Sequence, residues 1–154
     1  MKQSRTLVMG IGNLLLADEG VGVHVARALL EAGCPEGVTV VDVGTAILDA
    51  LPEMEDADRI IVVDAVKADK EPGTIYRMPF DHFESRNCIA SMHGFDLSRV
   101  LALTRQARFP EVLVIGIEPA RIDWSLELSA RVAAQFPVLV QVVRRELDGH
   151  GQAT

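Results

Sequence analysis

The feature that most constrains the fold is a series of short apolar runs, each bounded by polar or turn-forming residues. Four runs of six or seven residues carry charge only at or near their ends: Arg5–Ile11, Val38–Val43, Arg59–Asp64 and Val112–Ile117. Runs of this length and composition are typical of strands that are buried on both faces of a sheet. A fifth run, Thr74–Met78, is shorter and contains Arg77, so we expect it at a sheet edge.

Helical patterns separate these runs. The expected helices are Gly20–Ala32, ended by Gly33 and Pro35; Ala46–Leu51, closed by Pro52; Phe95–Arg108; and a C-terminal helix with Ser129 as its N-cap and Pro137 as a kink. Strands that alternate with helices predict a mostly parallel sheet with helices on both faces. We therefore expect a single-domain α/β fold, a three-layer α/β/α sandwich around a five-stranded twisted sheet.

Size and charge narrow the possible functions. The 154 residues predict one domain, 1–154, with a frayed tail over 148–154. A net charge of −7 argues against nucleic acid and anionic membranes as partners, and no apolar run approaches the roughly 18 residues of a membrane span. A signal peptide is rejected because glycines and Asn13 interrupt the N-terminal apolar stretch. Cys34 and Cys88 lack metal-binding spacing, so we expect reduced thiols in a cytoplasmic protein.

The turn after the first apolar run, GIGNLLLADEG (10–20), begins like a dinucleotide-binding turn. Two tests argue against that interpretation. The third glycine of the pattern is replaced by Leu15, and the acid that should follow by about 20 residues is absent, since Asp42 lies too far along the chain. In addition, Asp18 and Glu19 would repel a phosphate at the helix start. The turn is therefore expected to serve a different ligand.

Polar side chains gather where the expected strands end. Parallel strands place their carboxyl ends, and hence their binding sites, at one edge of the sheet. The residues expected there are Asn13, Asp18, Glu19, Asp42, Asp64, His93, Glu118 and Asp123. Crowded carboxylates need a cation or shared protons. Glu19, Asp64 and His93 together suit a first-row divalent metal with open positions, or general acid–base chemistry.

Each of these residues also has a purely structural interpretation. Glu19 can be a favourable charge in a first helical turn, and Asp64 can simply end an apolar strand. Asp42 can hydrogen-bond a turn, and His93 can start a helix. The residue types alone leave both interpretations open.

Six segments occur in an order that resembles a known family. They are GIGNLLLADEGVGVHVARAL, VDVGTAILDAL, RIIVVDAV, EPGTIYRM, SMHGFDL and VIGIEP. The chain resembles the hydrogenase maturation endopeptidases over nearly its whole length, from about Arg5 to Leu147. The first segment carries the most specific part of the pattern. The resemblance implies a twisted five-stranded sheet between helices and removal of a short C-terminal extension from the large-subunit precursor of a nickel–iron hydrogenase.

The resemblance also implies roles for individual residues. The family's nickel-site residues match Glu19, Asp64 and His93, and Asp42 matches a further acid near the site. One departure is Val43, where many members have a glycine. The nickel is implied to arrive with the precursor after its insertion there, so we expect no tightly bound metal in the protein itself. The expected protein is a monomer whose partner is the nickel-loaded precursor.

Two other functions remain open at this stage. A non-catalytic checkpoint or chaperone protein would use the same ligands to bind the precursor without cutting it. A small-molecule hydrolase on a similar sheet would carry its own metal. The sequence offers no convincing nucleophile, and it does not decide whether nickel or a carboxylate-activated water does the chemistry. The segment 79–90 and the EPARID loop are expected to shape partner choice.

Overall fold

The computed structural model describes residues 4–81, 92–104 and 110–151, and for residues 92–96 and 149–151 it describes the backbone alone. Five strands form one sheet: β1 (Thr6–Ile11), β2 (Val38–Gly44), β3 (Arg59–Ala65), β4 (Ile75–Pro79) and β5 (Glu111–Ile117). Every expected strand is present, and each bound lies within one residue of its prediction. The length and composition of the apolar runs were therefore sufficient to locate the sheet.

The strand order is β2-β1-β3-β5-β4. The pairs β1–β2, β1–β3 and β3–β5 are parallel, whereas β4 pairs with β5 in the antiparallel direction at one edge. This order confirms a mostly parallel sheet and the edge position of the fourth strand. From β1 the chain moves outward to β2 and then returns to the other side of β1 to form β3. The carboxyl ends of β1 and β3 therefore flank the point where the direction of winding reverses.

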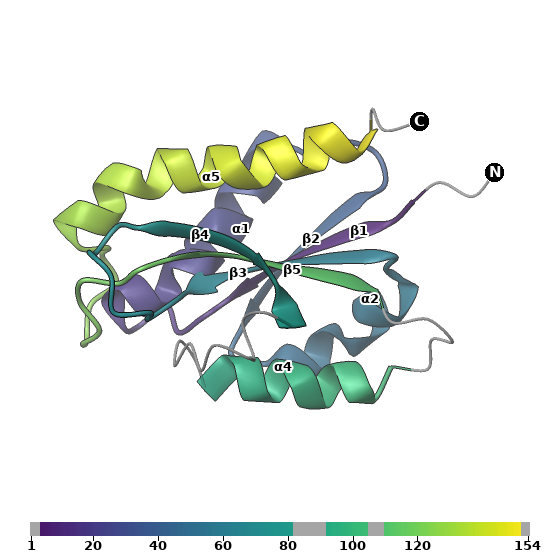
Figure 1. Ribbon diagram of the computed structural model, residues 1–154, viewed down its shortest axis with the longest axis horizontal. Helices are drawn as coiled ribbons and strands as arrows, with labels where there is room; N and C mark the ends of the chain where they lie inside the picture. Colours follow the sequence, from purple (N-terminus) through teal and green to yellow (C-terminus); the bar gives the residue numbers. More distant parts are fainter. Residues whose placement is uncertain (1–3, 82–91, 105–109, 152–154) are drawn as a thin grey trace.

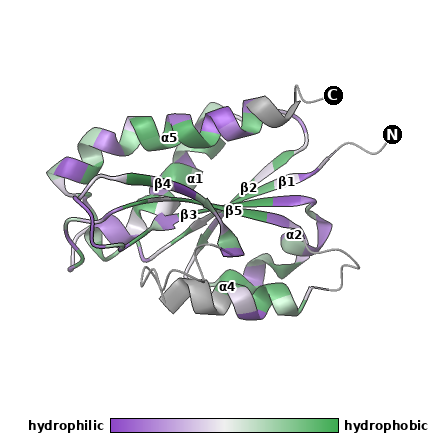
Figure 2. Cartoon of the chain, in the orientation of Figure 1, coloured by the Kyte–Doolittle hydropathy of each residue, from purple (hydrophilic) through white to green (hydrophobic). Residues whose placement is uncertain are grey.

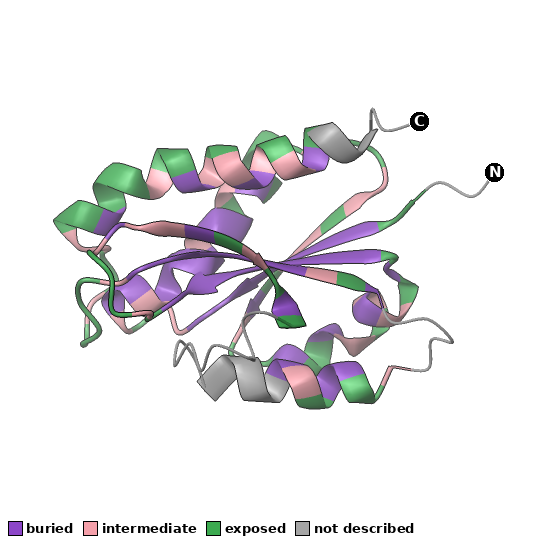
Figure 3. Cartoon of the chain, viewed as in Figure 1, coloured by how far each residue is buried: buried purple, intermediate pink, exposed green. Residues whose placement is uncertain are grey.

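Helices cover both faces of the sheet and complete the three layers (Figure 1). The helices α1 (Val21–Ala32) and α5 (Ala130–Gly151) enclose one apolar core with side chains such as Val8, Val63 and Ile115. On the other face, α2 (Leu51–Asp56) and α4 (Met92–Ala102) enclose a second core with Leu7, Ile60 and Val62. The central strands are hydrophobic and buried along their length, while α5 alternates between buried and exposed positions (Figures 2 and 3). Among the described residues, no helix has the length and apolarity that crossing a membrane requires.

Helix ends differ from the sequence predictions in two places. Pro52 does not close a helix: it lies in the first turn of α2, which follows a short 3-10 segment, η2 (Ile47–Ala50). Proline suits that turn because its missing N–H would have no helical partner there. Helix α4 begins before Phe95 and ends at Ala102, where the Thr104 hydroxyl donates to the Leu101 carbonyl at 2.7 Å. The expected helical residues 105–108 lie outside the described part of the chain.

The C-terminal helix is placed as expected. The Ser129 hydroxyl accepts a hydrogen bond from the Val132 N–H at 3.4 Å, which confirms Ser129 as the N-cap. Pro137 lies inside α5, and the helix extends to Gly151, which includes the first four residues of the segment for which fraying was expected.

An ion-pair cluster fastens α5 to the sheet. Glu146 accepts hydrogen bonds from Arg77 of β4 at 2.7 and 2.8 Å and from the buried Arg59 of β3 at 2.6 Å. The bidentate bond from Arg77, followed by the bond from Arg59, lowers the pKa of Glu146 to about 2.

Candidate active site

The candidate site lies at the carboxyl edge of the sheet, where β1 and β3 end side by side. Strand β1 continues into Gly12, a loop, and the short 3-10 segment η1 (Ala17–Gly20) that precedes α1. Strand β3 ends with Asp64 and Ala65. Because the two strands are parallel neighbours, the Gly12 turn and Asp64 reach the same edge.

Gly12 holds the turn against both of the expected carboxylate residues. Its φ of +143° disfavours any residue with a side chain. A Cβ atom at Gly12 would lie 1.9 Å from the Glu19 carbonyl oxygen and 3.5 Å from Oδ1 of Asp64. Glycine is therefore needed here for space as well as for conformation, and the turn lies between the Glu19 backbone and the Asp64 carboxylate.

The two residues differ in environment. Asp64 is only 5% exposed, and its Oδ1 accepts a hydrogen bond from the Ala65 N–H at 2.8 Å. Glu19 is half-buried in η1. One carboxylate is thus fixed at the end of a strand, while the other belongs to a half-buried residue of a short helical turn. Such a pair can bind a cation or place a water molecule for general base catalysis.

His93 lies in the first turn of α4 and not in a loop before the predicted helix Phe95–Arg108, and its side chain lies outside the described part of the structure. The helix packs on the face of the sheet that contains Val62 and Val66. Asp64 alternates with these two valines along the chain, so it is on the α4 side of the sheet. The third expected ligand therefore begins the helix that covers the same face as Asp64.

Asp42 is on the other face. It pairs in the sheet with Gly10, which packs against α1, and its Oδ2 accepts a hydrogen bond from Nε of Arg27 in that helix at 3.0 Å. Between Asp42 and Gly44 the register shifts, and the buried Val43 occupies the bulge. The structure does not bring Asp42 into the pair formed by Glu19 and Asp64.

The turn after Asp42 is nevertheless linked to the site. Gly44 has a φ of +61°, and its carbonyl accepts a hydrogen bond from the Gly12 N–H at 3.0 Å. The valine that departs from the family pattern, Val43, points its side chain into the core beside α2 and α4. The bulge therefore fixes the Gly12 turn from the β2 side.

His24 of α1 lies near Asp42, and no role in the site was predicted for it. Its Nε2 is buried without a hydrogen-bond partner among the described residues. Burial, followed by the charge of Arg27, lowers the pKa of His24, so the neutral imidazole is favoured.

Asp18, the other half of the acidic pair, has a structural role. It is fully buried, and four donors share its two oxygens. Oδ2 accepts from the N–H groups of Ala120 and Arg121 at 2.8 and 2.9 Å and from the Ser129 hydroxyl at 2.8 Å, while Oδ1 accepts from the Ser129 N–H at 2.8 Å. We expected Asp18 beside the possible ligands at the carboxyl edge of the sheet, but its carboxylate holds the loop 118–129 and the start of α5.

Of two further carboxylates of the rim, Glu118 is also committed to the fold, whereas Asp123 makes only a local surface contact. Glu118 is buried, and its Oε1 accepts from the Tyr76 hydroxyl at 2.6 Å and from the N–H groups of Ala68 and Lys70. Asp123 forms an exposed ion pair with Arg121 at 2.7 Å. No regular spacing in the sequence separates these anchoring carboxylates from Glu19 and Asp64, because their partners are more than 40 residues away for Glu118 and more than 100 for Asp18.

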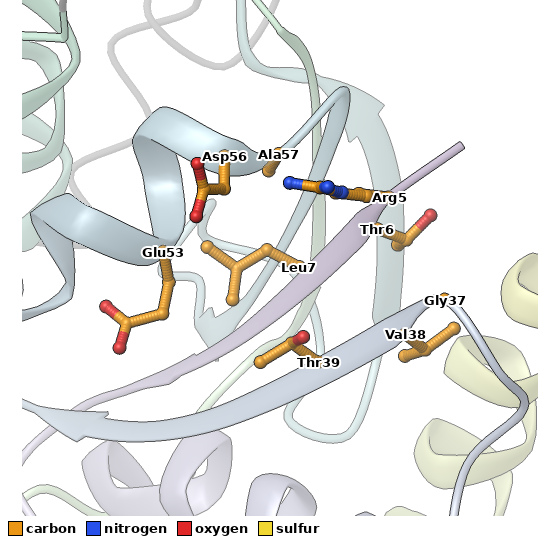
Figure 4. Close-up of a pocket in the computed structure, with 9 residues that line it drawn as sticks. All are labelled: Arg5, Thr6, Leu7, Gly37, Val38, Thr39, Glu53, Asp56 and Ala57. Carbon is orange, nitrogen blue, oxygen red and sulfur yellow. The ribbon is translucent and has the colours of Figure 1, made fainter. Parts of the chain in front are cut away.

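The described residues contain no cluster of three or more His, Cys, Asp or Glu side chains suited to a metal, and the His93 side chain is not among them. A pocket of about 360 Å³ lies at the opposite, amino edge of the sheet (Figure 4). Its lining includes Arg5, Leu7, Thr39, Glu53 and Asp56. The pocket is thus separate from the candidate site.

Fold and site together define an α/β protein with a carboxylate-lined site at the reversal point of a parallel sheet. The hydrogenase maturation protease family model matches residues 23–146. The chain is 34% identical to the hydrogenase 2 maturation protease of Escherichia coli, over 90% of this chain and 88% of that protein. It is 35% identical to the hydrogenase expression/formation protein HupD of Rhizobium leguminosarum, over 97% of this chain and 77% of that protein.

Solved structures show the same relationship. The hydrogenase maturating endopeptidase HybD from E. coli superimposes with a TM-score of 0.85 at 30% identity, covering 96% of this chain and 94% of that one. The [NiFe] hydrogenase maturation protease HybD from Thermococcus kodakarensis gives 0.78 at 28% identity, with 93% and 99% covered. The chain belongs to the hydrogenase maturation protease family, and it is a peptidase. The resemblance inferred from the sequence motifs is confirmed.

Proposed function

We propose that the protein removes the C-terminal extension of a nickel–iron hydrogenase large-subunit precursor after nickel has been inserted. The observation that carries the proposal is the Gly12 turn, which borders both the Glu19 backbone and the Asp64 carboxylate in a member of this protease family. Nickel belongs to the substrate in this scheme. Glu19, Asp64 and His93 complete its coordination, and a precursor without nickel lacks the ion that these residues recognise.

The chemistry is hydrolysis of one peptide bond. A water molecule attacks the scissile carbonyl, the C–N bond breaks, and the products are a carboxylate and a free amine. Glu19 or Asp64 can accept the proton of the attacking water, or the substrate's nickel can polarise the carbonyl as a Lewis acid. Asp64 suits a role that needs a fixed carboxylate, because the Ala65 N–H orients it. Glu19 suits a role that needs access to the substrate, because it is half-buried at the rim. Asp42 has a supporting role through the turn that bonds Gly12.

We also propose that the protein acts as a monomer in the cytoplasm. Cys34 is a free thiol, which a reducing compartment preserves. The net charge of −7 supports a separate, soluble molecule.

A cleavage assay with charge-neutralising variants tests the proposal. Wild type, Glu19→Gln, Asp64→Asn and His93→Gln are incubated with nickel-loaded precursor, and mass spectrometry follows the loss of the extension. Asp64→Asn retains an oxygen that can accept the Ala65 N–H, so it removes the charge with little change of fold. The matched control is Asp56→Asn, an exposed carboxylate at the opposite, amino edge of the sheet.

We expect cleavage by wild type and the control, and at least a hundredfold slower cleavage by the three variants, on the scale of losing a general base. Binding of the precursor without cleavage by wild type would instead identify a checkpoint protein. Full activity in Glu19→Gln and Asp64→Asn would remove these residues from the mechanism.

A further inference from the structure

An exposed apolar surface lies beside the candidate site. Four large hydrophobic side chains are 48 to 77% exposed there: Leu15, Ile122, Trp124 and Leu126, which we call the rim patch. They are half of the eight exposed large hydrophobic side chains among the described residues, although they come from only two short segments. Trp124, the only tryptophan of the chain, is the most exposed of them at 77%. Clustered exposed hydrophobic residues mark interaction surfaces, and tryptophan is enriched among the residues that dominate binding energy.

The backbone holds the two segments of the rim patch side by side. The Ser125 N–H donates to the Leu15 carbonyl at 3.0 Å, and the Ala17 N–H donates to the Ser125 carbonyl at 2.8 Å, which forms a parallel bridge between Leu16 and Ser125. Leu15 and Trp124 each precede a bridged residue, so they are neighbours across the bridge. The patch is thus built before any partner arrives, which lowers the entropic cost of binding.

The anchor of this arrangement is also next to the site. The Asp18 carboxylate bonds the loop 118–129 at Ala120, Arg121 and Ser129, and Asp18 immediately precedes Glu19. Leu15 of the rim patch and Glu19 thus belong to one short stretch of chain, which Asp18 bonds to the loop that carries Trp124. Patch and site are therefore continuous along the chain.

We propose that the rim patch docks an apolar segment of the precursor polypeptide and so positions the bond to be cut. This inference rests on the proposed function, and it adds a substrate-positioning surface to the site. The continuity of patch and site favours the substrate as the occupant. A second copy of the chain is disfavoured because each copy carries a charge of −7, and because such a dimer would cover the Glu19 rim.

The single tryptophan provides a direct test. The protein is labelled with 5-fluorotryptophan, which gives one ¹⁹F resonance at position 124 because the chain has one tryptophan. Unlabelled nickel-loaded precursor is added, and spectra are recorded before appreciable cleavage. We expect a saturable shift or broadening of the resonance. An unchanged resonance under conditions where the precursor binds would overturn the proposal, and a shift produced by raising the concentration of the labelled protein alone would assign the patch to a second copy instead.

Kinetics give a second, independent test. The double variant Trp124→Ser/Leu126→Ser is expected to raise KM for the precursor about tenfold or more, with kcat changed less than about twofold. The control is Leu30→Ser/Val138→Ser, which removes two exposed hydrophobic side chains from α1 and α5, away from the rim patch, and should leave both constants unchanged.

The outcomes separate the two proposals. An unchanged KM in a folded Trp124→Ser/Leu126→Ser variant, or an equal rise in the control, would overturn the docking surface while cleavage by wild type still supports the protease function. If wild type does not cleave the precursor at all, the proposed function fails, and the ¹⁹F titration still decides whether the patch binds it.

Discussion

The buried carboxylate of Asp18 offers the sharpest prediction about stability. Asp18→Ala removes the acceptor of four donors, the backbone N–H groups of Ala120, Arg121 and Ser129 and the Ser129 hydroxyl. Asp18→Asn is a milder change, because the amide keeps one oxygen. If that oxygen replaces Oδ2, three donors keep their acceptor, and only the Ser129 N–H faces an NH2 group.

The magnitudes follow from the number of donors affected. Each buried donor left without a partner costs about 1 to 3 kcal/mol. For Asp18→Ala we take the lower end for all four donors, because the loop 118–129 is near solvent and can relax, and expect a loss of about 4 kcal/mol. For Asp18→Asn one donor is affected, and the charge of the acceptor is lost as well, so we expect about 2 kcal/mol.

Urea denaturation monitored by circular dichroism measures these losses as changes in the free energy of unfolding. Asp123→Asn serves as the control, because the pair of Asp123 with Arg121 is more than half exposed and should contribute less than about 0.5 kcal/mol. An Asp18→Ala protein within about 1 kcal/mol of wild type would refute the idea that this carboxylate holds the loop and the start of α5.

Three further predictions follow from the structure. Gly12→Ala should destabilise the fold by more than about 3 kcal/mol and abolish cleavage, because its Cβ would overlap the Glu19 carbonyl in addition to straining the backbone. Gly33→Ala, at a φ of +84° with open space around it, meets the backbone strain alone and should cost about 1 to 3 kcal/mol in denaturation and retain activity. Since the folded-state pKa of Glu146 is lowered from 4.5 to about 2, its contribution to stability is present above pH 4.5 and is lost as the pH falls towards 2; Glu146→Gln should therefore flatten the pH dependence of the urea midpoint in that window. Elemental analysis of the purified protein should find no stoichiometric metal, and one tightly held zinc or nickel ion per chain would instead favour a hydrolase that carries its own metal.

The sequence predicted the sheet well and the site less completely. Strand positions could be predicted because burial on both faces requires an apolar run in each strand. The helices of the other two layers could be predicted from the helical spacing of their apolar residues. Helix ends were harder: Pro52 suits both the end of one helix and the first turn of the next, and only the packed structure decides between them.

The different roles of Asp18, which anchors a loop, and Glu19, which belongs to the candidate site, could not be predicted from the sequence. Asp18 and Glu19 are adjacent and chemically similar, and what distinguishes them is a set of hydrogen bonds to residues more than 100 positions later in the chain. Glu118, like Asp64, comes at the end of an apolar strand, and its hydrogen-bond partners lie 42 to 50 positions earlier in the chain. Asp64 and Glu19 could be proposed as ligands from the residue types and the family pattern, but their meeting at Gly12 is a property of the fold.

The central claim is that cleavage requires the nickel carried by the substrate, and one comparison tests it directly. Wild-type protein is incubated with equal amounts of nickel-loaded and nickel-free precursor, and the C-terminal extension is followed by mass spectrometry. The proposed coordination by Glu19, Asp64 and His93 predicts that the nickel-loaded precursor is cut and the nickel-free precursor remains intact. Cleavage of both at the same rate would contradict it.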